Sequence, residues 1–206
     1  MIKNIFFDFD GTLVNSQLRL YNLFKELTNC SMTYDEYWKI KRQRINQKDF
    51  LKRYFNYSDE MIADFKKNWL LKIEEPHRFK DDFLVDGMRE VLEKLSKDNN
   101  LYLVTHRQSQ ELTLKEAEDL GISKYFKKIM ASEQKITKVQ MIENNVKVSK
   151  EDILIGDTGE DIKDAKKLGI KSIAVAWGIL NYEVLKEYNP DFIAKGIEDF
   201  DKCPFL

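Results

Sequence analysis

Short runs of apolar residues recur along the chain, and each run ends in a polar or glycine-containing turn. The clearest runs cover residues 5–7, 101–104, 153–155 and 173–176, and a shorter one covers 192–193. Continuous apolar runs of this length are typical of strands that are buried on both faces of a sheet. The pattern therefore predicts a set of buried strands that begins almost at the N-terminus.

Helical patterns lie between these predicted strands. Met88, Val91, Leu92 and Leu95 recur at the spacing of one helix face, and the segments 112–120 and 162–168 each end at a glycine. A glycine after the last periodic residue is a common helix C-terminus. Strands that alternate with helices favour an α/β fold with a doubly wound parallel sheet.

Residues 16–83 break this alternation. Helical periods are present, as at Leu20, Leu23, Phe24 and Leu27, but no strand is evident. The segment is too long for an ordinary connection between a strand and a helix, which takes about 2 to 6 residues. We therefore predict a helical cap domain at 16–83, inserted after the first strand of a core formed by 1–15 and 84–206.

Composition limits the class of protein. The 206 residues allow one full-sized domain and a modest insertion, and 34 basic against 35 acidic residues give a net charge of -1. This balance argues against a nucleic-acid partner, and no stretch of about 20 apolar residues indicates a membrane span. The two cysteines, Cys30 and Cys203, lie in no metal-binding or disulfide pattern. We expect a cytoplasmic protein, either monomer or homodimer, with no membrane partner.

Polar residues follow several of the predicted strands. Asp8, Asp10 and Thr12 follow the first strand, Thr105 follows the second, and Asp157 follows the third. Ligands of open α/β sheets bind at the carboxyl ends of the strands. Three carboxylates that converge there repel one another unless a divalent cation neutralises them, and hard oxygen ligands favour magnesium. The sequence therefore predicts a Mg²⁺ site.

Two further groups suit a phosphate. A hydroxyl at Thr105 and an ammonium at Lys138 could hold an anionic phosphate opposite the metal. Together with the carboxylates, they indicate phosphoryl transfer.

Four segments match a known pattern. The residues Asp8-Phe-Asp-Gly-Thr-Leu-Val, Val104-Thr105, Lys138, and Gly156-Asp157-Thr-Gly-Glu-Asp161 resemble, in order and spacing, the four motifs of the haloacid dehalogenase (HAD) superfamily. The resemblance extends over the whole chain. It implies a Rossmann-like core with a helical cap of the C1 type, similar to phosphoglycolate phosphatases.

The resemblance also implies roles for the acidic residues. Asp8 would be the nucleophile that accepts the phosphoryl group, and Asp10 would be the general acid and base. Asp8, the backbone carbonyl of Asp10, and Asp157 would bind the metal. Asp161 and Thr12 would lie behind these ligands, with Asp161 an occasional direct ligand.

The phosphate-binding residues follow from the same resemblance. Thr105 and the backbone N–H of His106 would bind the transferred oxygens, and Lys138 would neutralise the charge that the phosphate shares with Asp8. Lys138 is followed by Val-Gln-Met-Ile instead of the family's usual Pro-x-Pro, so Lys135 is a rival. The position of Met141 and Ile142 favours Lys138. The resemblance gives no role to the side chains of His106 and Arg107, nor to Glu160.

Residues 39–53 carry seven basic side chains and one acidic side chain, Asp49. Such a cluster is usually a solvated face. If it faced the active site, it could instead attract an anionic substrate.

The expected function is hydrolysis of a small phosphorylated metabolite by a Mg²⁺-dependent phosphatase, through an aspartyl-phosphate intermediate. Phosphoglycolate is the first single substrate that the resemblance suggests. Asp10 argues against carbon–halogen bonds, because the superfamily's dehalogenases resemble D-x-Y at this motif. A phosphotransferase similar to β-phosphoglucomutase and a phosphate-receiving signalling module are the alternatives.

Overall fold

The core of the protein is a parallel sheet with helices on both faces. The structure, a computed structural model, describes residues 3–206. Its six-stranded sheet has the order β5-β4-β1-β6-β7-β8, and every pair of neighbours is parallel. The strands are β1 (Asn4–Phe7), β4 (Asn100–Thr105), β5 (Phe126–Ala131), β6 (Ile153–Gly156), β7 (Lys171–Val175) and β8 (Phe192–Ala194). The predicted α/β class with a doubly wound parallel sheet is confirmed.

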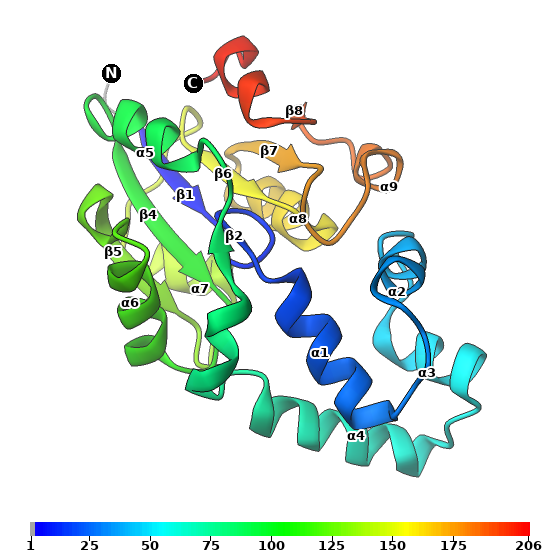
Figure 1. Cartoon of the computed structure of the whole chain (residues 1–206). Coiled ribbons are helices and arrows are strands. Elements are labelled where there is room, and N and C mark those ends of the chain that lie inside the picture. The colour runs from blue at the N-terminus through cyan, green and yellow to red at the C-terminus, as the bar shows by residue number, and fades with distance from the viewer. Residues whose placement is uncertain (1–2) are drawn as a thin grey trace.

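Five α-helices of the core connect these strands (Figure 1). They are α5 (Met88–Ser96), α6 (Gln110–Asp119), α7 (Lys138–Glu143), α8 (Gly159–Leu168) and α9 (Tyr182–Lys186), and the short 3-10 helices η2 (Ser123–Tyr125) and η3 (Ile197–Lys202) accompany them. The C-terminus of α8 is closed by Gly169 in a left-handed conformation, as the sequence predicts.

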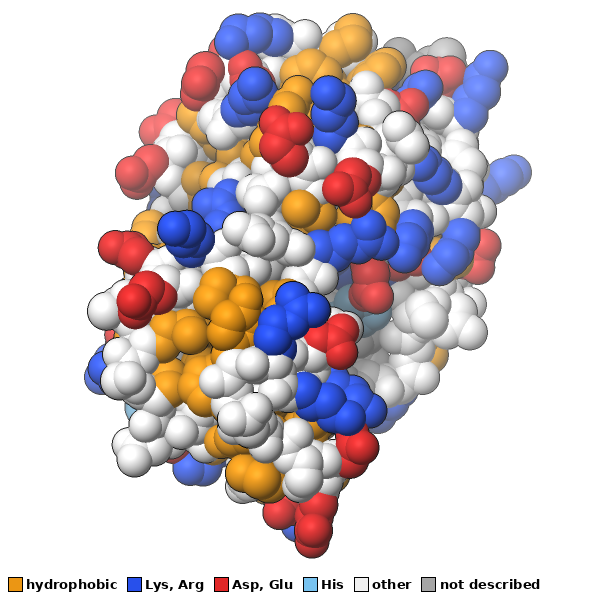
Figure 2. All heavy atoms as spheres, turned by 90° about the vertical axis from the view of Figure 1, so that its right-hand side faces the viewer, with side chains coloured by type: hydrophobic (Ala, Val, Ile, Leu, Met, Phe, Trp, Pro, Cys, Tyr) orange, Lys and Arg blue, Asp and Glu red, His pale blue; other side chains and the backbone are white. Residues whose placement is uncertain are grey.

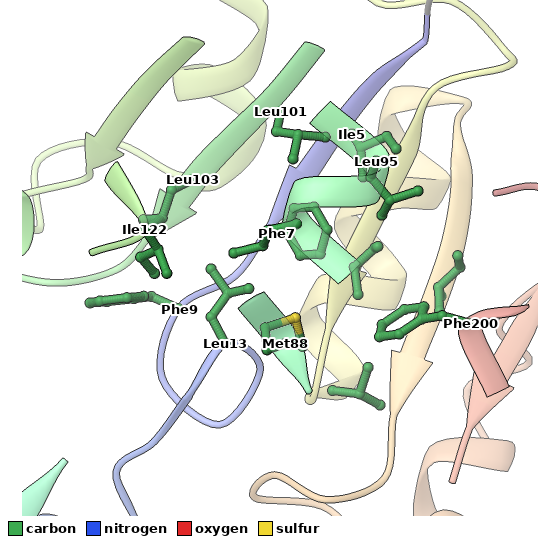
Figure 3. Close-up of a cluster of buried hydrophobic side chains, with 14 of the residues drawn as sticks. Ile5, Phe7, Phe9, Leu13, Met88, Leu95, Leu101, Leu103, Ile122 and Phe200 are labelled. Atoms are coloured by element: carbon green, nitrogen blue, oxygen red, sulfur yellow. The ribbon is translucent and has the colours of Figure 1, made fainter. Parts of the chain in front are cut away.

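Successive residues of the strands point to opposite faces of the sheet, and each face has its own hydrophobic cluster. Ile5 and Phe7 of β1 lie in one cluster with Met88 and Leu95 of α5 and Phe200 of η3 (Figure 3). The residue between them, Phe6, packs on the other face, against α7 and α8. Both faces of β1 are therefore covered, which explains its continuous apolar sequence.

The edge strand β5 is absent from the sequence prediction. It contains two exposed lysines, Lys127 and Lys128, in place of an apolar run. Lysines on an edge strand prevent pairing with another molecule, and they also remove the hydrophobic pattern from which a strand is predicted.

The insertion after β1 is helical. It contains α1 (Gln17–Thr28), α2 (Tyr34–Lys41), α3 (Gln47–Phe55), α4 (Asp59–Lys72) and the 3-10 helix η1 (Pro76–Asp81). Side chains of Thr33, Asn46 and Ser58 each accept a backbone N–H bond at the start of α2, α3 and α4. An aromatic cluster around Phe24 and Tyr37 forms the core of this insertion, which we call the cap.

Two short strands connect the cap to the core. β2 (Val14–Asn15) leads into the cap, β3 (Phe83–Leu84) leads out of it, and the two pair in antiparallel orientation. Arg19 and Asp82 form a buried ion pair beside this ladder, with Nε 3.0 Å from Oδ1. The two linkers are thus joined by backbone and side-chain bonds.

None of the helices within residues 3–206 is both long and apolar enough to cross a membrane. Cys30 and Cys203 are free thiols.

Replacement of Phe24 by alanine tests the aromatic core of the cap. The ring of Phe24 lies 4.7 Å from that of Tyr37 and 5.3 Å from that of Phe50, measured between centroids, and the side chain is fully buried. We expect Phe24→Ala to lower the free energy of unfolding by about 3–5 kcal/mol in urea denaturation. Leu71→Ala, at a side chain that is 67% exposed, is the control and should change little. A loss below about 1 kcal/mol at Phe24 would contradict a well-packed cap core.

Candidate active site

The site forms where the carboxyl ends of three adjacent strands meet. Strand β1 lies between β4 and β6 in the sheet. Asp8 follows β1, Thr105 is the last residue of β4, and Asp157 follows β6. The backbone N–H of Asp8 bonds to the carbonyl of Ile155 at 2.9 Å, which continues the ladder by one residue. Sheet topology therefore brings these three residues together, although 149 positions separate Asp8 from Asp157.

A buried lysine links two of the carboxylates. The Nζ of Lys138 lies 2.6 Å from Asp8 Oδ1 and 2.5 Å from Asp161 Oδ1. Lys138 is the first residue of α7, and Thr137 begins that helix with a capping box. Helix α7 thus fixes the backbone from which the lysine reaches the end of β1.

Burial and neighbouring charges shift the pKa values of Asp8 and Lys138. Burial raises the pKa of Asp8 to about 6, although the ammonium of Lys138 opposes the rise. Burial alone lowers the pKa of Lys138, but Asp161 and Asp8 outweigh it and raise that pKa. Lys138 therefore stays cationic at neutral pH.

The structure distinguishes the two candidate lysines. The side chain of Lys135 is 73% exposed and pairs with Glu133 at 2.9 Å, whereas Lys138 is buried against Asp8. The expectation from the position of Met141 and Ile142 agrees with this placement, since both are buried in α7.

Three carboxylates form a cluster that suits a metal ion. Oxygens of Asp8, Asp157 and Asp161 lie within 4.8 Å of one another, and all three residues are buried. Asp157 Oδ2 accepts the backbone N–H of Ile179 at 2.6 Å. Asp157 Oδ1 is buried and has no hydrogen-bond partner within the described part of the chain. This unpartnered oxygen, in an all-oxygen cluster, fits a hard divalent cation such as Mg²⁺.

The excess of negative charge in the pocket also fits a bound divalent cation. Burial, Asp8 and Asp161 raise the pKa of Asp157 well above its usual value. The pocket over the cluster is lined by more acidic than basic side chains: Asp8, Asp10, Glu74, Asp157, Glu160 and Asp161 against Arg19, Arg107 and Lys138. An anionic substrate enters such a pocket favourably only when a further cation is present.

Two glycines allow the backbone to approach Asp157 closely. A Cβ atom at Gly11 or at Gly178 would lie 2.2 Å from Asp157 Oδ2. Gly11 also has φ +81°, a conformation that residues with side chains rarely adopt. The glycine of the D-x-D-G-T segment is therefore required by both geometry and space.

The side chain of Asp10 contacts two arginines. Arg107 binds it in bidentate fashion, with Nε 2.7 Å from Oδ2 and Nη2 2.8 Å from Oδ1, and Arg19 also bonds to Oδ1. Burial raises the pKa of Asp10, but Arg107 and Arg19 outweigh burial and hold that pKa well below its usual range. In this arrangement Asp10 is an ionised carboxylate.

Both arginines belong to a larger buried network. Arg107 also pairs with Glu116 of α6, and Arg19 pairs with Asp82 in the linker. Burial raises the pKa of Asp82 to about 7, although Arg19 opposes the rise. Sequence reasoning missed these four residues. Only Arg107 had a signal, its place directly after a strand that ends at the site.

The remaining predicted residues lie at different distances from the site. Thr105 is buried, and both Thr105 and His106 line the pocket. His106 Nδ1 lies 3.3 Å from Ser132 Oγ, and burial and Lys138 lower the pKa of its ring. Thr12 does not line the pocket. Its hydroxyl is buried without a hydrogen-bond partner among residues 3–206, and its carbonyl accepts the indole N–H of Trp177 at 3.1 Å.

The cap supplies the outer wall of the pocket. The cavity has a volume of about 280 Å³, and its cap side consists of Arg19, Leu20, Trp69, Leu70, Ile73 and Glu74. Sequence reasoning did not single out these wall residues for the pocket, because helical periodicity identifies a buried face but not what it is buried against.

The basic segment 39–53 lines no part of this pocket. The backbone N–H of Asn181 bonds to the carbonyl of Arg42 at 3.1 Å, and Arg44 pairs with Glu187 of the core at 3.1 Å. Figure 2 shows the side of the molecule that carries α2, α3 and α9, where basic side chains are spread among acidic ones. In this structure the segment joins cap to core and does not face the substrate site.

Comparison with known proteins decides the family. The family model described as haloacid dehalogenase-like hydrolase matches residues 5–175. The chain belongs to the haloacid dehalogenase-like hydrolase family. This confirms the resemblance that the four motifs indicate, and it makes the protein a hydrolase of the phosphatase class.

Named relatives of this family cover the whole chain. A protein from Clostridium perfringens that carries the name PpaX is 31% identical over 98% of this chain and 97% of its own length. Pyrophosphatase PpaX from Oceanobacillus iheyensis is 26% identical over 96% and 94% of the two chains. The solved haloacid dehalogenase-like protein SP0104 from Streptococcus pneumoniae is 26% identical, with a TM-score of 0.75 and coverage of 98% and 97%.

Removal of each lysine tests their placement. We expect Lys138→Met to lower kcat/KM by at least about a hundredfold, because the buried cation beside Asp8 is lost. It should also destabilise the protein by about 3–5 kcal/mol in denaturant, because the carboxylates of Asp8 and Asp161 stay buried without a cationic partner. Lys135→Met is the matched control and should retain both activity and stability. Equal losses in the two variants would contradict the assignment.

Proposed function

We propose that the protein is a Mg²⁺-dependent phosphatase that acts on a small phosphorylated compound through an aspartyl-phosphate on Asp8. The observation that supports this most strongly is the arrangement around Asp8. One of its oxygens is bonded to Lys138, and the carboxylate lies in a cluster with Asp157 and Asp161 that suits a divalent cation. Domain bounds of 16–83 for the cap and 1–15 with 84–206 for the core are part of this proposal.

The first chemical step forms the covalent intermediate. A carboxylate oxygen of Asp8 attacks phosphorus, and the bond between phosphorus and the leaving oxygen breaks. Lys138, the hydroxyl of Thr105 and the backbone N–H of His106 hold the transferred oxygens and stabilise their charge. Asp8, Asp157 and the carbonyl of Asp10 would bind Mg²⁺, with Asp161 beside them. When bound, the ion supplies positive charge to the phosphoryl oxygens.

The second step releases phosphate. Asp10 takes a proton from water, the water oxygen attacks phosphorus, and the bond to Asp8 breaks to restore its carboxylate; Asp10 then releases the proton to solvent. The two arginines keep Asp10 ionised, as a base must be, but they also make it a weaker base, so Asp10 must release at least one of these bonds to take the proton. The cap forms one wall of the pocket, and its closure over bound substrate would exclude other water during the reaction.

We propose pyrophosphate as the first substrate to test, ahead of phosphoglycolate. The relatives named PpaX support this order, as does the paired state of Asp10. A departing phosphate is a much weaker base than an alkoxide, so its departure depends less on a proton, which an ionised Asp10 cannot supply. The cavity of about 280 Å³ also suits a small substrate.

A panel of phosphate compounds tests this function. Phosphate release should be measured with Mg²⁺ and pyrophosphate, phosphoglycolate, sugar phosphates and nucleotides, and product analysis separates hydrolysis from transfer to a sugar. We expect Asp8→Asn to lower turnover by at least about a thousandfold. Asp119→Asn, at an exposed carboxylate paired with Lys115, should retain it. Full activity of Asp8→Asn would refute the covalent scheme.

Metal binding should depend on pH in a defined direction. The pKa of Asp8 is about 6 in the metal-free protein, so below that pH the carboxyl holds a proton that Mg²⁺ must displace. We expect Mg²⁺ affinity, measured by calorimetry, to fall as the pH drops through about 6, by up to about tenfold per unit for the proton on Asp8 and more steeply where Asp157, whose pKa is also raised, holds a second proton. Asp157→Asn should bind the ion much more weakly at every pH. Affinity that stays constant between pH 5 and pH 8 would contradict a protonated Asp8.

A further inference from the structure

A carboxylate of the cap holds the loop that follows β4. Glu74 lies between α4 and η1, at the C-terminal end of the cap. Its Oε1 accepts the backbone N–H of Gln108 at 2.8 Å, and its Oε2 accepts the backbone N–H of Ser109 at 3.2 Å. Both oxygens of one carboxylate therefore bind consecutive amides of the loop 105–109.

The contact is reinforced in the opposite direction. The side chain of Gln108 donates from Nε2 to the carbonyl of Leu70 at 2.9 Å. This carbonyl lies in the last turn of α4, where carbonyl groups lack partners within the helix. Three hydrogen bonds thus join the end of α4 to the loop.

The core holds the other side of the same loop. The backbone N–H of Ser132 bonds to the carbonyl of Thr105 at 2.9 Å, and that of Glu133 bonds to the carbonyl of Arg107 at 3.0 Å. The carbonyls of the loop are therefore fixed by the segment after β5, whereas two of its amides are fixed by the cap. The conformation of the loop depends on both parts of the molecule.

We propose that Glu74 is a positioning residue that sets the phosphate-binding loop. This rests on the proposed function, in which Thr105 and the N–H of His106 bind the transferred phosphoryl group. Glu74 lines the pocket but lies outside the cluster of Asp8, Asp157 and Asp161. A carboxylate beside an anionic substrate is unfavourable, and its two charge-assisted bonds to the loop account for its presence there.

The contact couples the position of the cap to phosphate binding. The loop has all of its hydrogen bonds only when Glu74 contacts the amides of Gln108 and Ser109. The cap position in this structure therefore favours binding of phosphate to the loop. By linkage, bound phosphate must favour this cap position to the same extent. The cap position then affects binding of the phosphoryl group, which all substrates share, as well as binding of the leaving group.

Kinetics with two unlike substrates test the role. The variants are Glu74→Ala, Glu74→Gln and the matched control Glu75→Ala, whose carboxylate pairs with Arg78 and not with the loop. Pyrophosphate and 4-nitrophenyl phosphate share the transferred group but differ in leaving group. We expect Glu74→Ala to lower kcat/KM by about tenfold or more, by the same factor for both, and to weaken inhibition by product phosphate.

Glu74→Gln should fall between the wild type and Glu74→Ala, because its amide keeps one acceptor oxygen but turns an NH₂ group toward the second backbone N–H. Glu75→Ala should match the wild type. A loss of kcat/KM confined to one substrate would show that Glu74 contacts the leaving group. Unchanged kinetics would show that Glu74 has no role in positioning the loop. Either result overturns the proposal.

Amide hydrogen exchange measures the contact independently of activity. In Glu74→Ala, we expect the amides of Gln108 and Ser109 to exchange at least about tenfold faster than in the wild type or Glu75→Ala. Unchanged exchange would overturn the proposal. Faster exchange in a protein that hydrolyses no phosphate compound would refute the proposed function and would still support the role of Glu74 in ordering the loop.

Discussion

The charge balance around Lys138 is the interaction on which the site depends. Three buried carboxylates lie together at the ends of β1 and β6, and a single ammonium bonds to two of them. Burial of a charge is costly unless a partner compensates it. Lys138 compensates part of this charge, and the unpartnered oxygen of Asp157 marks where a divalent cation would compensate the rest.

A second group of buried ion pairs surrounds the side chain of Asp10. The guanidinium groups of Arg19 and Arg107 face three carboxylates, those of Asp10, Asp82 and Glu116. These residues come from the first turn after β1, both ends of the cap, the loop after β4 and α6. The network therefore fixes Asp10, the proposed acid and base, relative to the cap, the loop after β4 and α6.

The sequence predicted structure best where a local pattern is typical of only one kind of element. Buried strands and the polar residues at their ends could be predicted, so Asp8, Thr105 and Asp157 were found. Strand β5 was missed because its lysines interrupt the apolar run. Glu74 and Arg19 could not be found: Glu74 binds an amide 34 positions away, Arg19 pairs with Asp82 63 positions away, and no local pattern marks such contacts.

The paired linkers determine how the cap can move. A single peptide linker permits twisting and sliding in several directions. Here β2 and β3 form a ladder, and the Arg19–Asp82 ion pair joins the linkers again on the cap side. Such a double connection leaves rotation about one axis as the easy motion. Trp69 and Glu74 lie in the cap wall beyond this joint, so substitutions there can change the shape of the pocket without changing how the cap is attached to the core.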